Sequence, residues 1–215
     1  NDTSDGDLSL VGPTMPSHDD TGWIALGTQQ NSGGWWDGDW SYRKQLTVDS
    51  SLVDSTLTDF PVLVILTSSN FNFSKALTTG EDIRFTDTAG TTAYPHEIER
   101  WDSGSEQAEV WVKLPSVSSS VDTNFHMYYG NSSATDGQDP TAVWDSSYAM
   151  VQHLNESSPG GGSYDDHYDS TSNNNDGEAE NGADMAANGK VAGADDFDGD
   201  NDILEMEDNS SLDLG

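Results

Sequence analysis

The sequence contains no cysteine, so disulfide bonds cannot hold its fold together. Basic residues are also scarce: 7 lysines and arginines stand against 39 acidic residues, giving a formal net charge of −32. Nucleic acid and anionic membranes require basic surfaces, so we expect neither as a partner. At molar salt the Debye length falls to about 3 Å and screens the self-repulsion. We therefore expect a halophilic protein from brine, with a moderately acidic marine protein as the alternative.

Long apolar runs and catalytic motifs are missing as well. No apolar stretch approaches the length of a transmembrane helix, so we expect no membrane insertion in this segment. The five histidines form no HExxH or H-x-H arrangement, and there is no G-x-S-x-G elbow, P-loop or dinucleotide fingerprint. The sequence therefore predicts a protein that is not an enzyme and has no zinc site, and it indicates no catalytic residue.

What the chain does contain is aromatic residues and strand-like alternation, mostly between Trp35 and Tyr168. Apolar and polar residues alternate in the segments 41–49, 81–87, 108–115 and 123–131, while 60–66 is a continuous apolar run. Asn, Gly, Ser and Pro clusters separate these segments. The pattern predicts an all-β fold, an antiparallel, jelly-roll-like β-sandwich. We also expect a strand at 148–154 and a short helical turn within 72–82.

Composition divides the chain into three parts. Residues 1–34 are polar, and we interpret them as a leader or as an extended arm that adds a strand to a neighbouring sheet. Residues 35–147 form the predicted β-sandwich domain. Residues 148–215 are rich in Asn, Asp and Gly and have too few apolar residues for a core of their own, so we expect the start of a second β domain.

Ordered motifs between residues 35 and 145 carry a resemblance. "WWDGDWSYRKQLTVD", "DFPVLVIL", "GEDIRFTD", "HEIERWD", "AEVWVKLP" and "MYYGN" follow one another, and this order resembles an uncharacterised extracellular β domain of archaeal and bacterial surface proteins. The segment after it resembles the first half of a laminin-G/concanavalin-like jelly roll. Its 169–177 loop has Ser172 where such loops usually have Gly.

The resemblance implies a setting. The two domains often occur in tandem in adhesins and large surface proteins, and fused to MotA/TolQ/ExbB-type proton channels. Half a jelly roll leaves apolar faces and strand edges open. We expect the native chain to continue beyond Gly215; completion by a second chain through strand exchange, and an irregular tail, are the alternatives.

Two acidic loops are candidate metal sites. Asp169, Asn173 and Asn175 offer side-chain oxygens from one loop, and Asp198, Asp200 and Asp202 stand at alternate positions of an extended segment. Calcium takes six to eight oxygen ligands of these kinds. Similar jelly rolls often hold structural calcium near such loops, so we predict structural calcium here. The alternative is the ordinary surface of a very acidic protein.

Other features indicate an extracellular, cell-surface location. N-x-S/T sequons, the acceptors of N-glycosylation, occur at Asn1, Asn72, Asn131, Asn155 and Asn209. The chain begins with Asn rather than Met, so we expect a processed segment. Trp111 lies opposite the apolar face of its strand, which makes it the candidate ligand-binding aromatic.

Together these features favour a non-catalytic extracellular surface or filament protein that acts in adhesion or assembly and is stabilised by calcium. Its expected partners are other copies of itself, other surface proteins and glycans. Two alternatives stay open: a carbohydrate-binding or viral tail-fibre receptor-binding module, and the extracytoplasmic part of an ion-driven motor complex.

Overall fold

The computed structural model of the chain describes all residues except 1–8, 12–34, 157–165, 181–183 and 214–215. The chain divides into two compact units, which we call the N-terminal unit (residues 1–139) and the C-terminal unit (residues 140–215). The sequence prediction placed this division at 147–148. No helix among the described residues is both long and apolar enough to cross a membrane.

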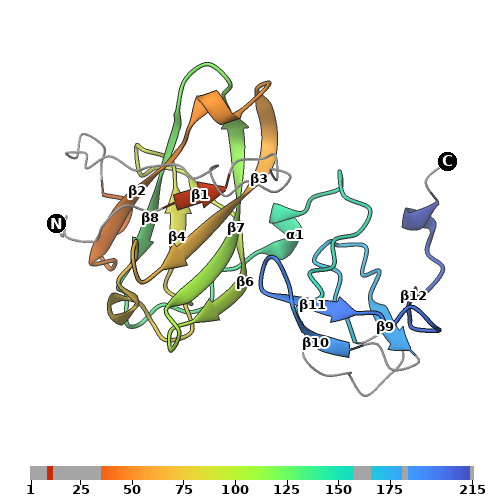
Figure 1. The fold of residues 1–215 in the computed structure, drawn as a ribbon. Coiled ribbons are helices and arrows are strands. Elements are labelled where there is room, and N and C mark those ends of the chain that lie inside the picture. Colours follow the sequence, from red (N-terminus) through yellow and green to blue (C-terminus); the bar gives the residue numbers. More distant parts are fainter. Residues whose placement is uncertain (1–8, 12–34, 157–165, 181–183, 214–215) are drawn as a thin grey trace. The chain divides into compact units, whose positions relative to one another are not determined.

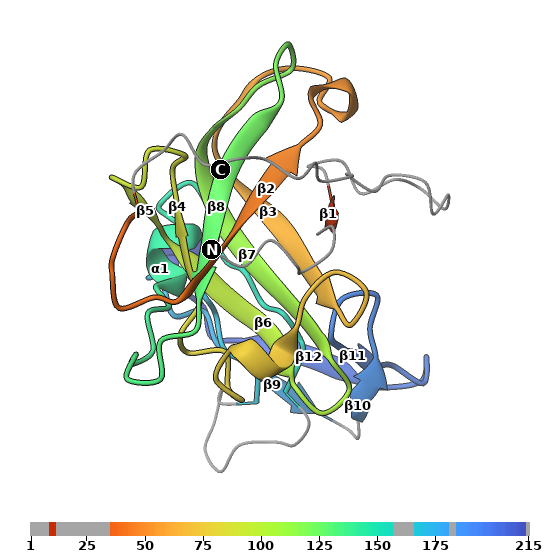
Figure 2. The same cartoon turned by 90° about the vertical axis from the view of Figure 1, so that its left-hand side faces the viewer.

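The N-terminal unit is a sandwich of two antiparallel sheets (Figures 1 and 2). Its elements are β1 (Ser9–Val11), β2 (Tyr42–Val48), η1 (Ser50–Leu52), β3 (Leu57–Thr67), η2 (Phe73–Lys75), β4 (Arg84–Thr86), β5 (Ala93–Tyr94), β6 (His96–Asp102), β7 (Gln107–Val117) and β8 (Thr123–Tyr129). One sheet has the order β1-β3-β7-β6 and the other β2-β8-β4-β5. The predicted all-β antiparallel sandwich is therefore confirmed.

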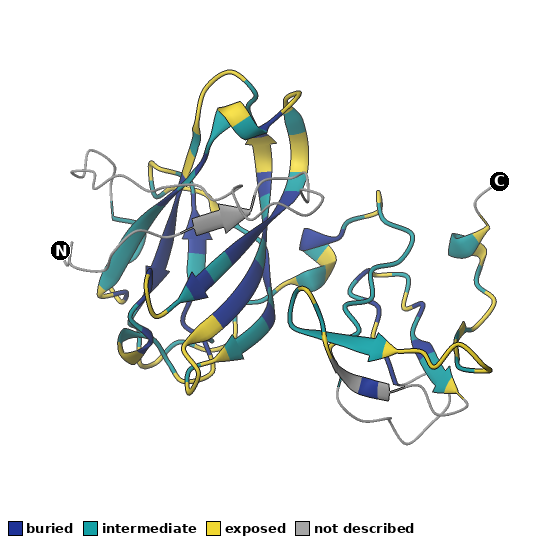
Figure 3. Ribbon diagram, in the orientation of Figure 1, coloured by how far each residue is buried: buried dark blue, intermediate teal, exposed yellow. Residues whose placement is uncertain are grey.

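The core lies between the two sheets and follows the alternation read from the sequence. In β7 every second residue from Ala108 to Leu114 is at most 1% exposed, and in β8 the same holds for Phe125, Met127 and Tyr129. These side chains join one apolar cluster with the inward residues of β2, β3 and β4. Figure 3 shows the resulting bands of buried and exposed residues along the strands. The helical turn expected within 72–82 is the short η2.

A fully buried carboxylate fixes the turn that follows β8. Asp82 is 0% exposed; its Oδ1 accepts the Leu77 backbone N–H at 2.8 Å, and its Oδ2 accepts those of Gly130 at 2.6 Å and Asn131 at 3.3 Å. Amide donors of this kind compensate a buried charge. Asp82 therefore ties the loop before β4 to the end of β8.

The described part of the N-terminal arm is a strand. β1 pairs antiparallel with β3 in the register Ser9↔Ile65, Leu10↔Val64 and Val11↔Leu63. The described part of the arm thus extends the edge of a sheet of its own chain; addition to a neighbouring sheet stays a prediction. The remainder of the predicted arm, residues 1–8 and 12–34, lies outside the described residues.

The C-terminal unit consists of short elements. They are α1 (Pro140–Val143), β9 (Gly177–Glu180), β10 (Asp184–Asn188), β11 (Gly193–Asp196), β12 (Ile203–Met206) and η3 (Ser210–Leu212). β9 pairs with β12 and β10 with β11, both antiparallel. The strand predicted at 148–154 is wrong: only an isolated bridge joins Gln152 to Asp169. Leu154 has a positive φ of 53°, which a bulky residue in a regular strand does not adopt.

Candidate functional site

The 169–175 loop of the C-terminal unit is organised by the Asp169 carboxylate. Oδ1 accepts the backbone N–H groups of Val151 at 2.9 Å and Thr171 at 3.0 Å. Oδ2 accepts the Thr171 hydroxyl at 2.7 Å and the Asn175 N–H at 2.9 Å. Burial opposes ionisation, but the amides of Val151, Thr171 and Asn175 outweigh it and lower the pKa of Asp169. The Asp169 carboxylate therefore holds the backbone of its own loop in place through hydrogen bonds.

The two asparagines of this loop bind other segments of the same unit. The Asn173 Nδ2 donates to the backbone carbonyls of Tyr148 at 3.2 Å and Ala149 at 2.9 Å. The Asn175 Nδ2 donates to the Ala149 carbonyl at 2.8 Å and to the Ser211 hydroxyl at 2.9 Å. The structure thus brings Asp169 and Asn175 into direct contact and places Asn173 beside the same 148–149 backbone. Calcium at these three residues stays a prediction.

The second predicted metal loop is a tight acidic turn. The Asp200 N–H donates to Asp198 Oδ1 at 2.8 Å, and the Asp198 N–H donates to Asp202 Oδ2 at 2.9 Å. Gly199 between them has φ 82°, a conformation that glycine adopts without strain. The three acids are therefore neighbours in one turn. Among the described residues, however, no three His, Asp or Glu side chains are arranged to hold one metal ion.

Trp111, the predicted ligand-binding aromatic, is half-buried on β7, on the face of the β1-β3-β7-β6 sheet that points away from the core. Its indole N–H donates to the Glu99 carboxylate at 2.9 Å, and its register neighbours are Leu63 on β3 and Glu97 on β6. The ring therefore stands in a mixed acidic and apolar row. Ligand binding there stays a prediction.

Three of the five sequon asparagines stabilise turns. The side-chain oxygens of Asn72, Asn131 and Asn209 accept the backbone N–H two residues ahead, from Ser74, Ser133 and Ser211. The Nδ2 of Asn209, the atom that a glycan would occupy, donates to the Asn173 carbonyl at 3.3 Å. Asn155 is exposed. Asn1 lies outside the described residues.

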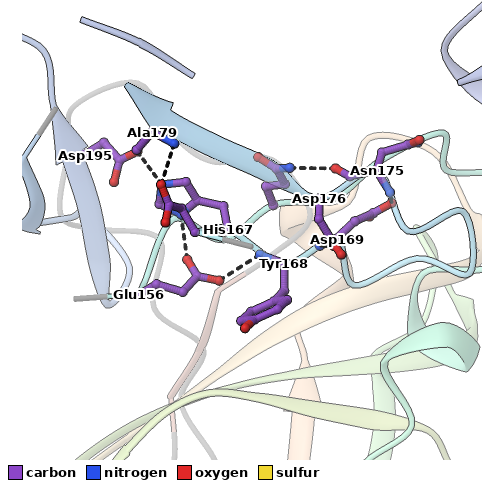
Figure 4. A network of polar contacts seen from close by, with 10 residues as sticks. Glu156, His167, Tyr168, Asp169, Asn175, Asp176, Ala179 and Asp195 are labelled. Atoms are coloured by element: carbon purple, nitrogen blue, oxygen red, sulfur yellow. Dashed lines mark hydrogen bonds and ion pairs between the residues drawn. The ribbon is translucent and has the colours of Figure 1, made fainter. Parts of the chain in front are cut away.

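A polar network that was not predicted from the sequence surrounds His167. Its side chain is 0% exposed, with Nδ1 2.8 Å from Glu156 Oε2 and Nε2 2.9 Å from Asp195 Oδ2 (Figure 4). The other Glu156 oxygen accepts the Tyr168 N–H at 3.0 Å, and buried Asp166 accepts the Ala179 N–H at 2.8 Å. Burial first, then the charges of Glu156 and Asp166, raise the pKa of Asp195, although His167 opposes them.

The only sequence signal for this network is the histidine in "DDHYDST", immediately before the loop. Asp195 lies 28 positions after His167, a separation that local motif spacing does not cover. His167 is joined to the start of β9 by an isolated bridge to Gly177, whereas Asp195 belongs to β11, so the contact joins separate segments of the C-terminal unit.

Part of the chain is similar to a known family of protein domains. The chain is similar over residues 79–178 to the model of a domain of unknown function, DUF2341. The similar segment begins shortly before Asp82 and ends within β9, so it includes the 169–175 loop. It supports the broad expectation of an uncharacterised β domain. No curated protein and no solved structure matches the chain.

Proposed function

We propose that this chain is a non-catalytic structural module of an extracellular surface or filament assembly. The observation that carries the proposal is the pairing of β1 with the edge of β3. Sequence positions 12–34 separate β1 from the sandwich that begins near Trp35. Adding a strand to an open sheet edge is a common way for one chain to bind another. A second copy of the chain would offer the same β3 edge.

The remaining polar chemistry supports a structural role. The carboxylate oxygens of Asp82 and of Asp169 accept hydrogen bonds from backbone amides of the loops around them. A charged group used in this way stabilises a turn and is not presented to a substrate. The acidic surface fits brine, where salt screens its charge. We also propose a laminin-G/concanavalin-like relationship for the C-terminal unit, supported by its antiparallel β9–β12 pair.

Cysteine trapping tests the assembly proposal cleanly because the chain has no cysteine of its own. Ser9 and Ile65 are register partners, and paired antiparallel residues lie about 4.5–5.5 Å apart, within reach of a disulfide. Mixing the Ser9→Cys chain with the Ile65→Cys chain under oxidation is expected to give a disulfide-linked dimer. Ser9→Cys mixed with Ser105→Cys, on the β6–β7 turn, is the matched control.

The outcome separates exchange from closure within one chain. If the mixed chains stay monomeric while the Ser9→Cys/Ile65→Cys double variant forms its internal disulfide, β1 closes its own sheet only. The assembly proposal would then be abandoned.

A calcium-stabilised form of this module is tested at constant molar salt. If calcium bridges the Asp198, Asp200 and Asp202 side chains or the 169–175 loop, EGTA lowers the melting temperature of the C-terminal unit and added calcium restores it. An unchanged melting temperature removes calcium from the proposal.

A carbohydrate-binding module is the second candidate, and an aromatic cluster favours it. Trp35 and Trp36 are half-buried and pack against Tyr128, with ring centroids 5.3 Å and 5.8 Å apart, and the Arg43 guanidinium lies 5.1 Å from the Trp35 ring. Aromatic faces stack on apolar ligand surfaces, sugar rings included. Binding on a glycan array that is lost in Trp35→Ala would favour this function over assembly.

A further inference from the structure

One peptide bond of the chain combines a reactive pair of residues with a boundary of the fold. The N-terminal unit ends at Asp139 and the C-terminal unit begins at Pro140. Of the seven prolines, Pro140 alone follows an aspartate; the others follow Gly, Met, Phe, Tyr, Leu or Ser. The single Asp–Pro bond of this sequence is therefore also the bond at which one compact unit ends and the next begins.

The residues on either side of this bond are held by their own units. On the N-terminal side, the Asp139 N–H donates to the His96 carbonyl at 3.0 Å, and the Gln138 side-chain oxygen accepts the Ile98 N–H at 2.5 Å. His96 and Ile98 both belong to β6. On the C-terminal side, Pro140 is the first residue of α1. These contacts remain in place when the bond between residues 139 and 140 is cut.

The aspartate side chain supplies a nucleophile for this bond. A carboxylate oxygen of Asp139 attacks the carbonyl carbon of its own residue and closes a cyclic anhydride, an intramolecular step that benefits from proximity. The C–N bond then breaks, and the proline nitrogen takes up a proton from solvent and leaves as a secondary amine. One water molecule opens the anhydride and restores the side-chain carboxyl beside a new α-carboxyl. The net reaction is hydrolysis of one peptide bond.

The local structure favours this reaction. Asp139 is exposed, so water reaches the bond. A residue that precedes proline is biased towards extended conformations, which limits the backbone freedom of the attacking residue. Proline has no backbone N–H and suits the first position of a helix, so its departure from Asp139 removes no hydrogen bond that Pro140 donates.

We propose that the folded chain cleaves itself between Asp139 and Pro140 and so separates the sandwich from the C-terminal unit. The reaction occurs once per chain, so it adds a processing step to a module that has no substrate. Exposed segments at domain boundaries are where a cut is best tolerated. The N-terminal product keeps both sheets and the apolar core between them. The proposal goes beyond the assembly described above and does not depend on it.

Incubation of the purified full chain in mild acid and molar salt tests the proposal. Mild acid supplies the proton for the leaving nitrogen, and salt screens the acidic surface. Mass spectrometry should find a product that ends at Asp139 and one that begins at Pro140, while the Tyr94–Pro95 bond stays intact as an internal control. Cleavage should be lost in Asp139→Ala and in Pro140→Ala. Asp54→Asn, which removes another exposed charge of the N-terminal unit, is the matched control and keeps the wild-type rate.

Two results would overturn the proposal. Equal cleavage of Asp139→Ala and wild type would show that the aspartate carboxylate is not the nucleophile. A folded chain that stays intact while the urea-unfolded chain is cut would show that the fold protects this bond. Asp139→Glu guards against loss of folding as the explanation, because it keeps the charge but must close a larger ring; it should be cut more slowly than wild type, and an equal rate would also contradict the proposal.

Discussion

The N-terminal and C-terminal units differ in the polarity of their buried side chains. Between the two sheets of the N-terminal unit the buried side chains are mainly apolar, and Val64, Phe85 and Phe125 are all 0% exposed. Among the described residues of the C-terminal unit, the buried apolar side chains are Val143, Trp144 and Met185, and the buried polar ones are Asp166, His167, Asp169, Thr171 and Asn175. Figure 3 shows that buried residues are frequent along the strands of the N-terminal unit and sparse in the described part of the C-terminal unit.

This difference indicates two sources of stability. Apolar burial depends on area and shape and tolerates changes of charge elsewhere. A polar interior depends on complete pairing, because one unpaired group costs about 1–3 kcal/mol. The N-terminal unit is therefore expected to respond most to cavities, and the C-terminal unit to the loss of single hydrogen-bond partners.

The largest effect is expected from a cavity in the sandwich. Phe85→Ala removes a ring that is 0% exposed and packs against His96 and Phe125, at centroid distances of 5.4 Å and 6.3 Å. We expect the free energy of unfolding of the N-terminal unit to fall by about 3–5 kcal/mol. Denaturant unfolding with hydrogen exchange resolved by unit measures this. Val121→Ala, at a residue that is 67% exposed, is the control and should change stability by less than about 0.5 kcal/mol.

The next effect is a loss of stability in acid. Burial first, and then the charge of Arg84, lower the pKa of His96 from its ordinary 6.5 to about 4. Above pH 6.5 the residue is neutral in both states and has no effect. As the pH falls from 6.5 to 4 the unfolded chain takes up the proton first, so the folded state loses about 3 kcal/mol; below pH 4 the loss is complete.

Comparison of His96→Gln with wild type isolates this contribution. Glutamine does not titrate, so the variant should lose about 3 kcal/mol less than wild type between pH 7 and pH 4, measured by urea unfolding. His153→Gln, in the C-terminal unit, should leave the pH dependence of the sandwich unchanged. Parallel curves for His96→Gln and wild type would show that His96 is not buried as a neutral ring.

The contrast between the units also explains what the sequence could predict. In β7 every second residue from Ala108 to Leu114 enters the core, and so do Phe125, Met127 and Tyr129 of β8, although the other face of β8 is also buried. The sandwich and its inward residues could therefore be predicted. The same rule failed at 148–154, where Leu154 leaves the extended conformation and the segment is held by Asn173, Asn175 and Asp169. Hydrogen bonds between distant segments leave no period in the sequence.

The candidate sites follow the same division. The loop at 169–175 could be found because its Asp and Asn residues are adjacent in sequence. The His167 network could not, because Glu156 and Asp195 approach the ring from segments on either side of it in the chain. The structural role of Asp82 could likewise not be predicted from "GEDIRFTD", because its hydrogen-bond partners Gly130 and Asn131 follow almost fifty residues later.

Removal of one charge should destabilise the C-terminal unit selectively. Asp169→Asn puts an NH₂ group among four hydrogen-bond donors, so we expect a loss of about 1.5–3 kcal/mol in the free energy of unfolding, the range for hydrogen bonds to a charged group. Hydrogen exchange should rise in the C-terminal unit and stay constant in the sandwich. Asp198→Asn, on the exposed acidic turn, removes the same charge and serves as the control. Equal effects of the two variants would mean that net charge, not pairing, holds this unit.

The smallest expected effect is a difference in stability between variants of two sequon asparagines, each of which caps a 3₁₀ turn. Asn72 caps η2 in the sandwich, and Asn209 caps η3 in the C-terminal unit. Replacing either by Ala removes a cap worth about 1 kcal/mol. Asn209→Ala also removes the hydrogen bond from Nδ2 to the Asn173 carbonyl, so this variant should lose more free energy of unfolding than Asn72→Ala. Denaturant unfolding of the two variants measures the difference.

Glycan occupancy tests the same hydrogen bond. Because a glycan on Asn209 would occupy the same nitrogen, glycosylated protein should carry less sugar there than at exposed Asn155, which peptide mass spectrometry measures. High occupancy at Asn209 would show that its Nδ2 is not committed to the loop.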